Sequence, residues 1–217
     1  RLFQRGALVV LLALGIAALL IAPPADTTVR WLLAAALVWW LLAFGWITLA
    51  PRRGSDGLRL CAGVLSLLPL WLAVVWIRSA VPDGSLWLLF ALLVIVGTDT
   101  GAFVVGRRWG RIKLAPYVSP QKTWEGVIGG LVLALAVGLS GAHYFGIEMP
   151  KLLPLCLAAA AMSVIGDLLE SLLKRQAGVK DSGRLVPGHG GVLDRIDSLT
   201  AGMPVMALGL DALGVLS

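Results

Sequence analysis

Charged residues are scarce in this 217-residue chain: they make up 14% of it, against about 25% in an average soluble protein. Hydrophobic residues make up 59%, and the mean hydropathy is +0.90. This composition excludes an ordinary soluble domain and indicates an integral membrane protein.

Several other signals are also missing. The two cysteines, Cys61 and Cys156, lie in apolar segments without CxxC spacing, which argues against a disulfide framework or a zinc site. There is no Walker motif, no dinucleotide fingerprint and no internal repeat of the kind that transporters often have. No basic-aromatic segment suits nucleic acid, so we interpret the net charge of +6 as a sign of membrane orientation and lipid contact. The chain begins at Arg1 rather than Met, so we expect further residues before it.

Seven apolar segments are long enough to cross a hydrocarbon core of roughly 30 Å. They are residues 6–22, 31–50, 58–78, 86–105, 126–147, 152–173 and 199–216. The sequence therefore predicts an all-α, polytopic integral membrane helical bundle of about seven transmembrane helices. We expect residues 1–217 to form a single membrane-embedded domain.

Basic residues concentrate in alternate connections between these segments. Fifteen of the 18 Lys and Arg fall in one set of connections, and only Arg30, Arg78 and Lys151 fall in the other. By the positive-inside rule, the long connections 106–125 and 174–198 then lie together on the cytoplasmic side. We expect the active-site loops there.

Five carboxylates lie at similar depth, near the predicted cytoplasmic ends of the spans. They are Asp99, Asp167, Glu170, Asp194 and Asp197. A carboxylate inside a span costs about 3 kcal/mol and normally faces a partner or a watery cavity. The three-residue spacing of Asp167 and Glu170, repeated in Asp194 and Asp197, predicts two acidic pairs on two helix ends that converge on one cation. Oxygen-only ligands favour Mg²⁺. Taken singly, each carboxylate could equally be a helix cap or an interhelical hydrogen-bond partner.

The polar connections add cations and glycines to these acids. Lys122 precedes the fifth span, where a helix N-terminus favours anions. Residues 187–191 read Pro-Gly-His-Gly-Gly, and such a segment allows the backbone to approach a ligand closely. Pairs at four-residue spacing, Gly97 with Gly101 and Gly126 with Gly130, predict close helix packing, and they leave a homodimer open.

With these residues assembled, the chain resembles the phosphatidate cytidylyltransferase, or CDP-diacylglycerol synthase, family. The signature residues of that family are filled by Ser171, Lys174, Arg175, Lys180, Asp181, Pro187, His189, Gly190, Gly191, Asp194, Arg195 and Asp197. Two further blocks begin at Asp99 and at Ser119, and Gly166-Asp167 forms another. The resemblance covers roughly residues 95–200. We therefore divide the chain into a catalytic region, 86–200, and N-terminal helices without motifs, 1–85.

The resemblance implies the reaction of CTP with phosphatidate to give CDP-diacylglycerol and pyrophosphate, in the inner membrane of a bacterium. It implies Mg²⁺ as cofactor and leaves a second metal ion open. The expected catalytic residues are Lys122, Lys174, Arg175, Lys180, His189 and Arg195. The residues expected to approach the nucleotide are Ser119, Gly188, Gly190 and Gly191. The expected metal ligands are Asp99, Asp167, Glu170, Asp194 and Asp197.

Two other interpretations start from the same residues. His189 and Asp194 have the H-x4-D spacing that glycerolipid acyltransferases use to activate a hydroxyl group. Intramembrane carboxylates also occur in ion and lipid transporters. The acyltransferase interpretation leaves Asp99, Asp167 and Lys122 unexplained. The transporter interpretation predicts charged residues near the bilayer midplane, whereas the sequence places them toward the ends of the spans.

Overall fold

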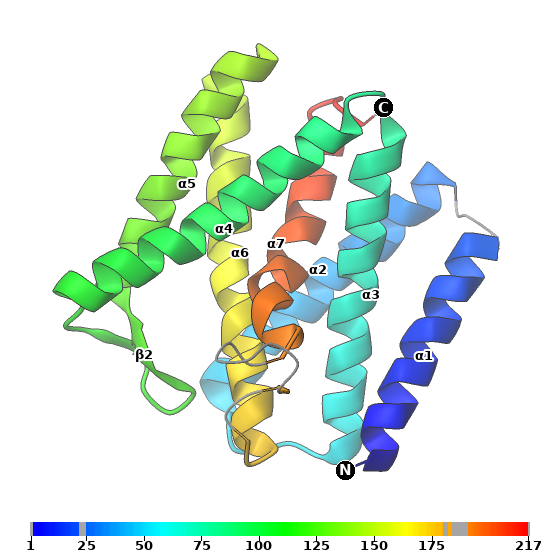
Figure 1. Cartoon of the computed structure of the whole chain (residues 1–217), viewed down its shortest axis with the longest axis vertical. Coiled ribbons are helices and arrows are strands. Elements are labelled where there is room, and N and C mark those ends of the chain that lie inside the picture. The colour runs from blue at the N-terminus through cyan, green and yellow to red at the C-terminus, as the bar shows by residue number, and fades with distance from the viewer. Residues whose placement is uncertain (1, 22–24, 180–181, 184–190, 217) are drawn as a thin grey trace.

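The computed structural model describes residues 2–21, 25–179, 182–183 and 191–216. Within these residues the chain forms seven helices, one for each predicted segment. They are α1 (Leu2–Ile21), α2 (Asp26–Leu49), α3 (Asp56–Ala80), α4 (Gly84–Trp109), α5 (Trp124–Phe145), α6 (Met149–Gln176) and α7 (Leu193–Ala212). Successive helices alternate in direction, so the α2–α3 connection, the α4–α5 connection and the end of α6 all lie toward the lower end in Figure 1. The two long polar connections therefore start from the same end of the bundle.

Five of the seven helices, α2 to α6, are long and apolar enough to cross a membrane. Among the residues that the structure describes, Val9–Ile21 of α1 forms a shorter apolar helix. The chain is thus a multi-pass membrane protein, and the count of seven spans stays a prediction.

The structure is largely helical, as predicted, and within its described residues only the 106–125 connection contains strands. Strands β1 (Lys113–Ala115) and β2 (Ser119–Thr123) pair antiparallel there. The hairpin is closed at its base, because the Ile112 N–H donates to the Glu125 carboxylate at 3.1 Å and its carbonyl accepts from the Trp124 N–H at 2.9 Å. Thr123 then caps α5 by accepting from the Gly126 N–H at 3.2 Å. The hairpin thereby fixes the position of β2 relative to the start of α5.

The predicted glycine seams are used inside the chain. A Cβ on Gly101 would lie 2.6 Å from the Gly129 carbonyl oxygen, and one on Gly130 would lie 2.7 Å from that of Thr98. Helices α4 and α5 therefore touch backbone to backbone, and Gly101 and Gly130 serve that contact.

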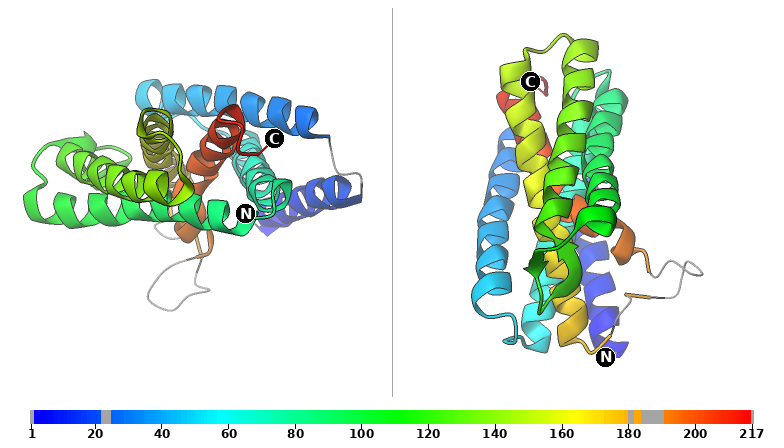
Figure 2. Two further views of the ribbon diagram at one scale, coloured as in Figure 1. Left: turned by 90° about the horizontal axis from the view of Figure 1, so that it is seen from above. Right: turned by 90° about the vertical axis from the view of Figure 1, so that its left-hand side faces the viewer.

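A second close approach joins α6 to the first turn of α7. A Cβ on Gly166 would lie 2.5 Å from the carbonyl oxygen of Asp197. Seen from above, α6 and α7 lie between α5 on one side and α3 on the other (Figure 2). Buried side chains such as Ile77, Ile95, Leu152 and Met203 fill the space between α3, α4, α6 and α7. The glycine contact brings two acidic helix ends together at the edge of this core.

Candidate functional site

Four of the predicted carboxylates pair across helices rather than along them. Asp167 of α6 is close enough to Asp197 of α7 for their charges to repel, whereas Glu170 interacts with Asp194. The spacing alone predicts that the two pairs converge on one cation. Because the α6 residues contact α7 at two different heights, the carboxylates instead form two groups, each with its own lysine.

The first group lies next to the hairpin and consists of Asp99, Asp167 and Asp197 with Lys122. The Lys122 ammonium group lies 2.6 Å from a carboxylate oxygen of Asp167. The Ser198 hydroxyl donates to Asp99 at 2.6 Å, so α7 contacts α4 at this point. We call these four charged residues the hairpin-side group.

The hairpin-side group carries three carboxylates and one lysine. Burial, together with repulsion from Asp167 and Asp99, raises the pKa of Asp197 in the first turns of α7. Repulsion of this kind is relieved by a cation, and oxygen donors suit Mg²⁺. Within the described residues, no three His, Cys, Asp or Glu side chains gather closely enough to hold a metal as they stand. The three carboxylates of the hairpin-side group are the kind of oxygen donors that Mg²⁺ prefers. In this structure the positive charge beside them is the ammonium group of Lys122.

The second group consists of Glu170, Lys174 and Asp194. Lys174 forms ion pairs with both carboxylates, and its ammonium group lies 2.7 Å from Asp194. Asp194 also accepts from the Ser182 N–H at 2.9 Å, the Ser182 hydroxyl at 2.7 Å and the Gly191 N–H at 2.7 Å. Burial alone would raise the pKa of Asp194, but these donors outweigh burial and hold the pKa well below its usual range. Asp194 is thus held in its charged form by hydrogen-bond donors from the protein itself.

Asp194 ties together the described flanks of the long polar connection. Ser182 and Gly191 lie on either side of residues 184–190, and both donate to it. A Cβ on Gly191 would lie 2.3 Å from the Ser182 hydroxyl oxygen. Gly191, which the sequence predicts to approach the nucleotide, thus packs against Ser182 of the same chain, and its predicted role stays a prediction.

A cavity of about 640 Å³ opens beside the hairpin. We call it the hairpin cavity. Its charged lining comes from α4, β1, β2 and α6, and consists of Asp99, Arg107, Lys113, Lys122 and Asp167. Ser119, predicted to bind the nucleotide, lines the same cavity. Cations and carboxylates that share one cavity suit a ligand that carries both phosphates and a metal ion.

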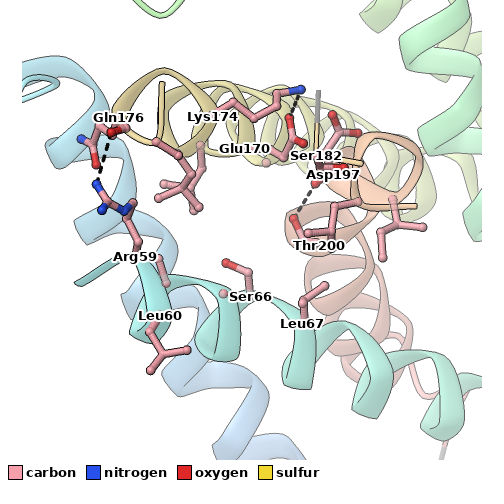
Figure 3. A pocket seen from close by; sticks show the side chains of 18 of the residues that line it. Arg59, Leu60, Ser66, Leu67, Glu170, Lys174, Gln176, Ser182, Asp197 and Thr200 are labelled. Atoms are coloured by element: carbon pink, nitrogen blue, oxygen red, sulfur yellow. Dashed lines mark hydrogen bonds and ion pairs between the residues drawn. The ribbon is translucent and has the colours of Figure 1, made fainter. Parts of the chain in front are cut away.

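A second cavity, of about 520 Å³, lies between α2, α3, α6 and α7. We call it the α3 cavity. Glu170, Lys174 and Asp197 line one part of it, and Leu60 and Leu67 of α3 line another (Figure 3). Because Asp197 also interacts with Asp99 and Asp167 of the hairpin cavity, it lies between the two cavities.

The remaining predicted site residues fall into two classes. Arg175 and Arg195 are exposed, on the last turn of α6 and the first turn of α7. Lys180, Gly188, His189 and Gly190 lie outside the described residues. Their predicted roles therefore stay predictions.

Sequence reasoning missed three polar residues at these cavities. Ser182 and Ser198 are hydrogen-bonded to Asp194 and Asp99, and Arg59 lines the α3 cavity. The two serines lie inside or next to the signature, so their proximity was a usable signal. Arg59 belongs to the region without motifs, and no sequence signal pointed to it.

A multi-pass helical bundle with acidic and basic side chains gathered at one end is an arrangement suited to a membrane enzyme that handles phosphates. Residues 2–213 match the Cytidylyltransferase family. The chain belongs to this family, and it is therefore a nucleotidyltransferase.

Among its curated relatives is a phosphatidate cytidylyltransferase of Pseudomonas aeruginosa, 45% identical over 188 residues, which are 82% of this chain and 68% of that protein. The enzyme of the same name from Haemophilus influenzae is 41% identical over 189 residues, 80% of this chain and 66% of that protein. One from Staphylococcus saprophyticus is 41% identical over 145 residues, 66% of this chain and 56% of that protein. The chain spans about two thirds or less of the length of these relatives. The family match supports neither the acyltransferase nor the transporter interpretation.

Proposed function

We propose that this chain is the catalytic part of a phosphatidate cytidylyltransferase, which makes CDP-diacylglycerol and pyrophosphate from CTP and phosphatidate for phospholipid synthesis. The observation that carries the proposal is the hairpin cavity, where Arg107, Lys113 and Lys122 face Asp99 and Asp167 in a chain that matches the family over residues 2–213. The bacterial relatives support a location in a bacterial inner membrane. The excess of basic residues at the hairpin end supports a cytoplasmic orientation for that end, where CTP is present.

The reaction requires one bond to form and one to break. An oxygen of the phosphatidate phosphate attacks the α-phosphorus of CTP, and the bond from that phosphorus to the oxygen bridging to the β-phosphorus breaks. Pyrophosphate leaves with the bonding electrons. The attacking phosphate monoester is largely ionised at neutral pH, so a strong general base is not required.

The protein must therefore orient the two substrates and stabilise negative charge. We assign Lys122, Lys113 and Arg107 to the triphosphate, because they line one cavity and cations neutralise the charge that develops on phosphoryl oxygens. We also assign Ser119 to a hydrogen bond with the nucleotide, because it lines the same cavity.

Mg²⁺ is part of this proposal, and Asp99, Asp167 and Asp197 are the residues that would hold it. When bound, the ion would neutralise and orient the phosphate oxygens. Glu170 and Asp194, which the sequence also suggested as ligands, contact Lys174 in this structure and would act by holding that lysine and the polar connection in place. A second ion remains open, as does a homodimer.

The test is incorporation of label from CTP into lipid. Full-length purified protein is incubated with α-³²P-labelled CTP, phosphatidate in mixed micelles and Mg²⁺. We expect label in the lipid phase with one pyrophosphate released per product. EDTA should abolish the transfer and added Mg²⁺ should restore it. A folded protein that leaves all label in the aqueous phase, or that instead transfers acyl groups from acyl-CoA without a divalent metal, would refute the proposal.

A further inference from the structure

The α3 cavity differs from the hairpin cavity in the chemistry of its walls. Much of its surface is aliphatic, with Leu60 and Leu67 from α3, Leu169 and Leu173 from α6, and Ile196 from α7. These aliphatic side chains offer no hydrogen-bond partners to a nucleotide base or ribose, whose burial against them would be unfavourable. They suit hydrocarbon chains.

The polar part of this cavity contains cations from two helices. Lys174 projects from α6, and Arg59 projects from the first turns of α3 (Figure 3). An aliphatic cavity with cations in its lining matches an amphiphile with an anionic head group. Arginine suits a phosphate in particular, because its planar guanidinium group can donate two parallel hydrogen bonds.

Arg59 is held in place by contacts that a ligand could replace. It forms an ion pair with Asp56, whose side chain is 62% exposed, while that of Arg59 is 25% exposed. An ion pair with so exposed a partner contributes little stability. The guanidinium group also donates to the main-chain carbonyl of Gln176 at 3.3 Å, which orients it toward the end of α6.

The last turn of α6 is itself tied to the connection before α3. The Gln176 side-chain amide donates to the carbonyls of Pro51 at 3.0 Å and Arg53 at 3.1 Å. The region without motifs is thus bonded directly to the helix that carries Asp167, Glu170 and Lys174. A substrate bound by Arg59 would lie in the cavity that Asp197 also lines, next to the hairpin-side group.

We propose that Arg59 binds the phosphate of the lipid substrate and that the aliphatic wall of the α3 cavity receives the adjoining part of its acyl chains. This inference rests on the proposed function and adds to it a substrate-binding residue from α3. CTP and phosphatidate then approach the shared carboxylates from opposite sides of α6 and α7.

The test compares Arg59→Gln and Arg59→Lys with the parent protein. Binding of phosphatidate in the absence of CTP is measured by native mass spectrometry in detergent, and KM is then measured separately for each substrate. Loss of one charge-assisted contact predicts about tenfold weaker phosphatidate binding and a similar rise in its KM. The KM for CTP should stay within about twofold, and Arg59→Lys should fall between the parent and Arg59→Gln.

Arg53→Gln provides the matched control, since Arg53 is an exposed arginine on the connection that leads into α3 and does not line the α3 cavity. It should leave phosphatidate binding unchanged. If Arg59 only fastens α6 to α3, Arg59→Gln will lower the unfolding temperature and affect both substrates equally, which would overturn the inference. Unchanged phosphatidate binding in Arg59→Gln would overturn it too. Because binding is measured without turnover, these results are distinct from failure of the parent protein to label lipid, which would refute the proposed function instead.

Discussion

The two sides of α6 differ in both chemistry and origin. On the hairpin side, Asp167 and Lys122 line a cavity together with Asp99 and Ser119, at which the two further motif blocks begin. On the α3 side, Glu170 and Lys174 belong to a largely aliphatic cavity completed by helices without motifs. The comparison shows that one short stretch of helix can present acidic groups to two different environments. It suggests that the chemistry depends on the hairpin side and that lipid recognition depends on the α3 side.

The largest expected effect comes from replacing the two acidic residues of α6 one at a time. Asp167→Asn should lower kcat by about 10² to 10³, because it removes a charge that faces Lys122 and the proposed metal. Glu170→Gln should lower kcat by less than about tenfold, since Lys174 keeps its second partner, Asp194. Both are measured as initial rates of CDP-diacylglycerol formation at saturating substrates.

Glu148→Gln serves as a control for this pair, because Glu148 is an exposed acid at the N-terminus of the same helix, paired with Lys151. It should retain full activity. Equal losses in Asp167→Asn and Glu170→Gln would mean that the two sides form one site, and the comparison would fail.

Replacing Lys122 should affect mainly the KM for CTP, and replacing Lys174 should affect mainly the KM for phosphatidate. Lys122→Gln should raise the KM for CTP by about tenfold or more, through loss of a charged contact to phosphate. Lys174→Gln should raise the KM for phosphatidate and also lower the unfolding temperature, because Glu170 and Asp194 would then be left without the cation between them. Steady-state kinetics with each substrate varied in turn, together with thermal unfolding, distinguish the two variants. The opposite assignment of substrates would reverse our interpretation of the cavities.

The positions of the helices could be predicted from the sequence, but the contacts between side chains on different helices could not. Long apolar runs locate each helix, because a span requires about 20 apolar residues. The hairpin was missed because its strands are only three and five residues long, with Pro116 directly after β1 and Pro120 inside β2. The spacing of Asp167 and Glu170 predicted neighbouring positions on α6 correctly. It could not show that α7 meets those positions at two heights, since that depends on the contact of Gly166 with Asp197.

The smallest expected effect concerns the polar connection between α6 and α7. Gly191 leaves no room for a Cβ, which would meet the Ser182 hydroxyl oxygen at 2.3 Å and the Gly183 nitrogen at 2.7 Å. Gly191→Ala should therefore displace the two N–H groups that reach Asp194 and lower kcat/KM for both substrates by roughly fivefold to tenfold, the equivalent of one strained or lost hydrogen bond.

Gly45→Ala is its control, because nothing lies within 4 Å of a Cβ at that position of α2. This variant should keep its activity and gain slightly in helix stability. An effect of Gly191→Ala on CTP alone would mean that this segment belongs to the hairpin side only. An effect on both substrates means that Asp194, through Ser182 and Gly191, holds the connection in a position on which both cavities depend.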